Sequence, residues 1–265
     1  MQTKPTQKNR TVKKSLNKAF LKEKVQRSEI ELFKTNLSKL FKRLDENESE
    51  ENDKGHLKDF LNNTYYKDTH LIATKDRVDL VIHNEKSPKS SVGVLFEIKR
   101  SKNVSEMVTT QNLNAKALHE LILYYLKERI ESKNFEIKNL VITNIYEWFV
   151  FDENLFDKLI FRNRKFTKYY DHFKQVEKNN DAFYKHCKAE LLPPILDQLE
   201  YTYFDLRKYQ KVTENEDITD DKKLIPLYKF LSPTHLLKLP FANDSNSLDK
   251  GFYSELLHIL GLEEK

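Results

Sequence analysis

The sequence reads Val-Asp-Leu-Val-Ile-His at residues 78–83 and Val-Gly-Val-Leu-Phe-Glu-Ile-Lys at residues 92–99. Both runs are short and apolar and are bounded by polar segments, a pattern typical of buried β-strands. The segment between them, residues 84–91, is polar and holds one proline and three serines, so it predicts a turn. We therefore expect the two strands to be neighbours in a hairpin.

Further helices and strands are expected on both sides of this hairpin. Periodicity predicts helices over residues 10–44, up to about residue 63, and over 113–131, and strands at 69–73, 138–143 and 147–152. After residue 152 the pattern becomes helical. This order predicts an α/β fold in which a mixed β-sheet is flanked by helices and is followed by an all-helical segment.

Glycine and cysteine usage excludes several classes of protein. The four glycines lie too far apart for a glycine-rich phosphate loop, which argues against folds that need one. The single cysteine, Cys187, rules out an intramolecular disulfide and a zinc site built on cysteines. No apolar leader and no run of about 18 apolar residues occurs, so we expect a cytoplasmic protein that does not span a membrane.

The positive charge is concentrated near the N-terminus. The net charge of the chain is +5, whereas residues 1–45 alone hold thirteen Lys/Arg against four Asp/Glu, a net of +9. Such a basic stripe suits contact with nucleic-acid phosphates. A solvated helix face is the alternative interpretation of the same charges.

Three polar residues stand out in the two central strands. Side chains alternate along a strand, so Glu97 and Lys99 project to one face and Ile98 to the other. Asp79 lies inside an apolar run, where a carboxylate is costly unless it is bound to something. If the strands form a hairpin, Asp79 can lie beside Glu97.

This grouping of side chains suits a divalent metal ion. Mg²⁺ prefers oxygen ligands and commonly takes one or two carboxylates together with water and substrate phosphate. Asp79 and Glu97 would supply the carboxylates and the backbone carbonyl of Ile98 a third ligand, with Mn²⁺ as an alternative ion. Lys99 would lie next to the metal-bound water and orient it or assist its deprotonation. A structural salt bridge between Glu97 and a lysine is the competing interpretation.

Several blocks of the sequence resemble one enzyme family. The chain is similar, over about residues 45–265, to the N-terminal PD-(D/E)xK nuclease region of type IIG restriction-modification enzymes, in blocks at residues 59–61, 79–83, 97–100, 115–121 and 141–149. The resemblance implies a restriction-endonuclease-like fold and a type II site-specific deoxyribonuclease that hydrolyses phosphodiester bonds. It implies that Asp79 and Glu97 are metal ligands and that Lys99 is the catalytic lysine. The superfamily often adds a glutamate from the preceding helix, here Glu50 or Glu51, with Glu51 preferred.

The resemblance also suggests how the chain is organised. Residues 1–44 would be a basic helical segment, 45–165 the nuclease core and 166–265 a helical connector toward a methyltransferase that is missing here. Because no glycine-rich cofactor loop and no Asn-Pro-Pro-Tyr motif occurs, no S-adenosylmethionine site is expected. The expected partners are double-stranded DNA and the rest of the restriction-modification polypeptide. With one site per chain, double-strand cleavage would need two copies brought together on DNA.

The sequence also allows other roles and functions. Gln111 and Lys116, close to the start of the long apolar helix, are candidates for contacts to substrate. A catalytically silent nuclease-like scaffold that binds DNA or another protein is one alternative function. A repair or junction nuclease with the same core is another.

Overall fold

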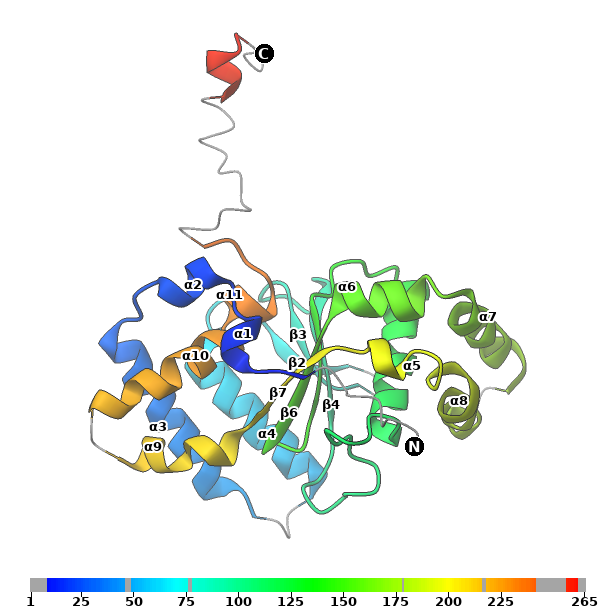
Figure 1. Ribbon diagram of the computed structural model, residues 1–265, viewed down its shortest axis with the longest axis horizontal. Helices are drawn as coiled ribbons and strands as arrows, with labels where there is room; N and C mark the ends of the chain where they lie inside the picture. Colours follow the sequence, from blue (N-terminus) through cyan, green and yellow to red (C-terminus); the bar gives the residue numbers. More distant parts are fainter. Residues whose placement is uncertain are drawn as a thin grey trace, which may run out of the picture.

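The computed structural model describes residues 9–45, 49–75, 78–177, 179–215, 218–241 and 256–261. Within these ranges the strands form a seven-stranded mixed sheet in the order β1-β7-β6-β5-β4-β3-β2 (Figure 1). The strands are β1 (Asn9–Arg10), β2 (Ile72–Lys75), β3 (Val78–His83), β4 (Val92–Ile98), β5 (Asn139–Thr143), β6 (Glu147–Asp152) and β7 (Tyr201–Asp205). β4 pairs with β5, and β1 with β7, in parallel, whereas the other neighbours are antiparallel.

Helices connect and cover these strands. The α-helices are α1 (Val12–Ser15), α2 (Lys18–Lys22), α3 (Arg27–Arg43), α4 (Glu50–Leu61), α5 (Lys116–Ile130), α6 (Glu153–Phe156), α7 (Arg164–His172), α8 (Asn180–His186), α9 (Gln210–Glu214), α10 (Asp221–Leu231) and α11 (Pro233–Leu236). π-Helical turns follow α4, α6, α7 and α8 as η1 (Asn62–Tyr66), η2 (Asp157–Phe161), η3 (Phe173–Glu177) and η4 (Cys187–Leu191), and 3₁₀ turns occur at η5 (Leu196–Gln198), η6 (Leu206–Tyr209) and η7 (Ile218–Asp220). No helix in the described ranges is long and apolar enough to cross a membrane.

The sheet lies between two layers of helices. Figure 1 shows α3, α4, α9 and α10 on one side of the strands and α5 to α8 on the other. Each layer has its own hydrophobic core: Phe33, Leu57 and Leu227 contribute to the first, and Leu118, Phe156 and Phe183 to the second. Burial of each such side chain stabilises the fold by about 1.5–3 kcal/mol.

The interior strand β4 is covered on both faces. All seven of its residues are buried, which explains why the sequence of this strand is an almost uninterrupted apolar run. Gly93 permits a close approach here, because a Cβ atom at this position would lie 2.3 Å from Asn84 Oδ1 and 2.4 Å from Leu237 Cδ2. The strand is thereby held between the hairpin turn and the C-terminal end of α11.

The expectation of an all-helical stretch after residue 152 was wrong. β7 lies inside the sheet between β1 and β6, where Phe204 pairs with Trp148 and their rings stack at 5.4 Å. The N-terminal segment, expected as one long or two shorter helices, differs as well, since it forms three helices and adds β1 to the sheet edge. The first core joins Val12, Leu57 and Leu224, so residues from the segments 1–44, 45–165 and 166–265 pack together.

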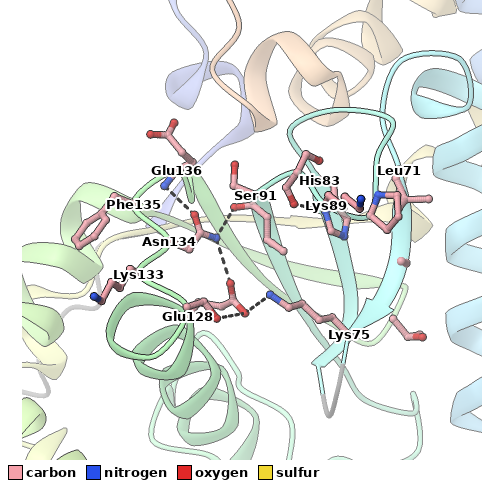
Figure 2. Close-up of a pocket in the computed structure, with 16 residues that line it drawn as sticks. Leu71, Lys75, His83, Lys89, Ser91, Glu128, Lys133, Asn134, Phe135 and Glu136 are labelled. Atoms are coloured by element: carbon pink, nitrogen blue, oxygen red, sulfur yellow. Dashed lines mark hydrogen bonds and ion pairs between the residues drawn. The ribbon is translucent and has the colours of Figure 1, made fainter.

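A cavity of about 590 Å³ lies where β4 begins and α5 ends (Figure 2). The buried carboxylate of Glu128 faces it and accepts from Lys75 Nζ at 2.6 Å and from Asn134 Nδ2 at 3.2 Å. Asn134 also donates to the carbonyl of Val92 at 2.9 Å. These polar groups satisfy one another, and none of the three residues expected to be catalytic lines the cavity.

Candidate active site

Asp79 and Glu97 lie opposite each other on neighbouring strands. In the antiparallel β3–β4 ladder Leu80 pairs with Phe96 and Val81 with Leu95, and continuing this register by one residue places Asp79 across from Glu97. Cβ atoms of directly opposed residues are about 4.5–5.5 Å apart. Burial raises the pKa of Glu97, and the negative charge of Asp79 raises it further, which agrees with this proximity.

Lys99 lies between two acidic side chains from different elements. Its Nζ is 2.7 Å from Glu97 Oε1 and 2.5 Å from Glu120 Oε2, which α5 contributes. Its backbone N–H donates to the carbonyl of Thr143 at 2.9 Å, so the lysine follows directly on the paired end of β4. The structure therefore brings Asp79, Glu97 and Lys99 together, as the alternation along the strands predicts.

Glu97 is buried and only partly satisfied. The residue is 2% exposed, and its Oε2 atom accepts no hydrogen bond from the described residues. Burial raises the pKa of Glu97 well above its usual range, and the carboxylate of Asp79 adds to this effect. A buried oxygen without a partner carries the full cost of its desolvation, so it marks a position that a cation would stabilise.

Asp79 makes two contacts through its two oxygens. Oδ2 accepts the backbone N–H of Ile98 at 2.7 Å, and Oδ1 lies 2.7 Å from Lys54 Nζ. Burial raises the pKa of Asp79 although both contacts act to lower it. Ile98, the expected backbone ligand, is the last residue of β4 and so lies between Glu97 and Lys99 at the end of the strand.

Helix α4 brings its first turns to these residues. Ser49 caps the helix, and the acidic residues that follow interact favourably with the partial positive charge of its N-terminus. Glu50 acts electrostatically on Asp79 and is 32% exposed at its side chain, whereas the side chain of Glu51 is 76% exposed. The structure thus favours Glu50 over Glu51 as the acid of this helix next to the site. The reason is that Glu51, one residue further on, turns toward solvent.

Both lysines of the site are held as ammonium groups. Burial by itself would lower the pKa of Lys99, but Glu97 and Glu120 outweigh burial and raise this pKa well above its ordinary value. Lys54 shows the same balance, because Asp79 and Glu50 overcome the effect of burial and raise its pKa to about 12. In this structure each lysine can therefore donate hydrogen bonds and neutralise negative charge.

The two candidates for substrate contacts are placed differently. Lys116, in the first turn of α5, lies 2.8 Å from Glu106 Oε1 and 3.9 Å from Glu120 Oε1, so it belongs to the edge of the charged cluster. Gln111 is exposed in the loop between β4 and α5, and its backbone N–H donates to Thr109 Oγ1 at 3.3 Å. The structure does not bring the side chain of Gln111 to Lys99.

Two charged residues of the site were missed by sequence reasoning. Glu120 shares the polar face of α5 with Lys116, and this position on an otherwise apolar helix was the available signal. Lys54 has no comparable signal, since one lysine among the polar residues of α4 is ordinary. Two buried tyrosines also lie close by. Burial raises the pKa of Tyr124, and the charge of Glu97 raises it further. Burial and the charge of Glu120 raise the pKa of Tyr184 in the same way.

The site offers few groups that could bind a metal ion. Among the described residues, no group of three or more His, Cys, Asp or Glu side chains is arranged to hold a metal ion. The ligands available at the end of β4 are two carboxylates, from Asp79 and Glu97, and the carbonyl of Ile98. Two carboxylates with water and phosphate are a common set for Mg²⁺, and the unpartnered Oε2 of Glu97 fits such a ligand.

Fold and site together define the class of this protein. It is an α/β protein with a mixed sheet and a partly buried cluster of carboxylates and lysines at the end of its central hairpin. The chain belongs to a family described as a domain of unknown function (DUF7149), which matches residues 10–244. No curated protein and no solved structure matches it.

Proposed function

We propose that this protein is a Mg²⁺-dependent DNA endonuclease domain of the PD-(D/E)xK type. One observation carries the proposal: Asp79, Glu97 and Lys99 converge at the end of a β-hairpin, and a buried oxygen of Glu97 has no hydrogen-bond partner among the described residues. Buried charges are expensive, and a purely structural cluster gains nothing from an unsatisfied carboxylate oxygen.

The residues of the site have distinct roles in this proposal. Asp79, Glu97 and the carbonyl of Ile98 would hold Mg²⁺, which would activate a water molecule and stabilise negative charge on the phosphate. The ammonium group of Lys99 lies beside Glu97 and can donate hydrogen bonds, so it would orient the attacking water or contact the scissile phosphate. Glu120 holds the ammonium group of Lys99 from the side of α5. Lys116, at the edge of the charged cluster beside Glu106 and Glu120, would contact a DNA phosphate.

The narrower assignment is the nuclease region of a type IIG restriction enzyme. The sequence resemblance in blocks between residues 59 and 149 supports it, and a methyltransferase with a target-recognition domain would then be its partner. The substrate would be double-stranded DNA in the cytoplasm, cut on both strands when two copies meet on it. A repair or junction nuclease uses the same chemistry on a different DNA structure.

One observation favours a second function. In the structure each of the two lysines pairs with a carboxylate, Lys54 with Asp79 and Lys99 with Glu97. Such an ion-pair network can be retained in a protein without catalysis, as in a nuclease-like scaffold that binds DNA or another protein. Metal binding separates the two functions, because a scaffold has no need to bind Mg²⁺ at Asp79 and Glu97.

Plasmid cleavage and calorimetry test the proposal together. The purified protein, Asp79→Asn, Lys99→Met and the exposed-turn control Lys86→Gln would be incubated with supercoiled plasmid and Mg²⁺. Cleavage by the wild type and by the control, lost in the other two variants, is the expected result. Mg²⁺ binding by calorimetry should disappear in Asp79→Asn and persist in Lys99→Met. If wild-type protein binds neither Mg²⁺ nor Mn²⁺, the scaffold function replaces the nuclease.

A further inference from the structure

Lys54 already occupies the carboxylate that a metal ion would need. Its Nζ lies 2.7 Å from Asp79 Oδ1, and the side chain is only 14% exposed. The other oxygen of Asp79 accepts the N–H of Ile98. Both oxygens of this carboxylate are therefore engaged, one of them by a full positive charge.

A divalent ion that binds Asp79 through Oδ1 competes with Lys54 for that oxygen. Mg²⁺ binds oxygen at about 2.0–2.1 Å. Sharing Oδ1 would place the ion at most about 5 Å from Nζ of Lys54, since that atom is 2.7 Å from the same oxygen. At this separation, in a partly buried site, the repulsion between the two cations is strong. Binding of the ion and the Lys54–Asp79 contact therefore compete.

The first turn of α4 offers Lys54 another position. Glu50 Oε1 and Glu51 Oε2 lie 3.2 Å and 3.6 Å from Nζ, one helical turn before the lysine on the same helix. Residues three and four apart face each other on a helix, so the ammonium group can stay with these acids after it leaves Asp79. This gives both glutamates a role that does not require either one to contact the metal.

We infer that Lys54 is the resident counter-cation of the site, which a hard divalent cation displaces from Asp79 toward Glu50 and Glu51. The inference rests on the proposed function, because it assumes that Asp79 is a metal ligand. Without the metal, Lys54 neutralises a carboxylate whose charge would otherwise be unpaired. When the metal binds, the Lys54–Asp79 ion pair must break, and the free energy of breaking it lowers the net affinity for the metal. Lys54 is thus a determinant of metal affinity and not itself a ligand.

Calorimetric titration with Mg²⁺ and Mn²⁺ tests this exchange without relying on activity. Lys54→Met removes the competing charge and should bind Mg²⁺ at least about tenfold more tightly than wild type. Lys54→Arg keeps the charge and should stay close to wild type. Lys58→Met, one turn later on α4, is the matched control and should also bind like wild type. The metal-free Lys54→Met protein should unfold at a lower temperature and gain more from added Mg²⁺.

A double variant tests the receiving position independently. Glu50→Gln with Glu51→Gln leaves Lys54 with Asp79 as its main partner, so the affinity for Mg²⁺ should fall. This variant retains Lys54, and it answers the question even if Lys54→Met fails to fold.

The outcomes separate the two levels of the proposal. Wild-type binding of Mg²⁺ with an equal or weaker affinity in Lys54→Met would overturn the displacement of Lys54 and leave the metal site standing. An unchanged affinity in the double glutamine variant would exclude Glu50 and Glu51 as receiving acids. Absence of Mg²⁺ and Mn²⁺ binding in both wild type and Lys54→Met would overturn the proposed metal site, and the role of Lys54 with it.

Discussion

Replacement of Lys99 by methionine tests the charge arrangement of the site most directly. Methionine has a similar length and no charge, so the change removes an ammonium group and leaves the volume nearly unchanged. Lys99 is 6% exposed and lies between Glu97, at 2%, and Glu120, at 9%. Removing one partner of a buried ion pair costs about 3–5 kcal/mol, because an uncompensated charge remains. Each kcal/mol lowers the Tm of a protein of 150–250 residues by about 2–4 °C, so we expect a decrease of about 6–20 °C.

Thermal unfolding followed by circular dichroism, at pH 7.5 with a chelator, measures this effect. The double variant Lys99→Met/Glu120→Gln should recover part of the lost stability, since one of the two carboxylates that Lys99 neutralised is then replaced by a neutral amide. The exposed variant Lys86→Gln should stay within about 0.5 kcal/mol of wild type. A Lys99→Met protein that melts within about 2 °C of wild type, or effects of the two substitutions that simply add, would falsify the buried ion pairs described here.

Two further predictions concern Glu97 and Gly93. Because burial raises the folded-state pKa of Glu97 above its unfolded value, its contribution to stability is complete below about pH 4.3 and is lost as the pH rises through the folded pKa. Metal-free Glu97→Gln should therefore gain stability relative to wild type as the pH rises above about 4.3, in urea unfolding, and a difference that does not change with pH would contradict this. Gly93→Ala should lose about 1–3 kcal/mol by overpacking, because the new methyl group meets Asn84 and Leu237; unchanged stability in chemical denaturation would show that these neighbours move aside without cost.

Local pattern was sufficient for the central elements of the fold. The runs at residues 78–83 and 92–99 form β3 and β4, residues 147–152 form β6, and the long apolar helix forms α5 with slightly shorter ends. Each of these segments is mainly apolar, is bounded by polar residues and is buried along most of its length. In such segments the residues that must be buried are also the apolar residues that form the sequence pattern. The pattern therefore predicts the structure.

β7 shows where local pattern fails. Its sequence, Tyr-Thr-Tyr-Phe-Asp, is short and lies in a region with many helix-forming residues. It becomes a strand because β6 offers unpaired backbone groups and Trp148 offers a surface for Phe204. That partner lies more than fifty residues earlier in the chain. No local period encodes such a pairing, and the same is true of the two-residue strand β1 that completes the edge.

The sequence by itself determined which strand residues could meet. A short hairpin and the two-residue period of strands place Asp79, Glu97 and Lys99 on one face wherever the rest of the chain goes. Tertiary structure alone decided what surrounds them. Lys54 comes from a helix of one layer and Glu120 from a helix of the other, and their contacts depend on how the ends of α4 and α5 are positioned against the end of β4. The packing of two separate cores sets these positions, so no spacing in the sequence records them.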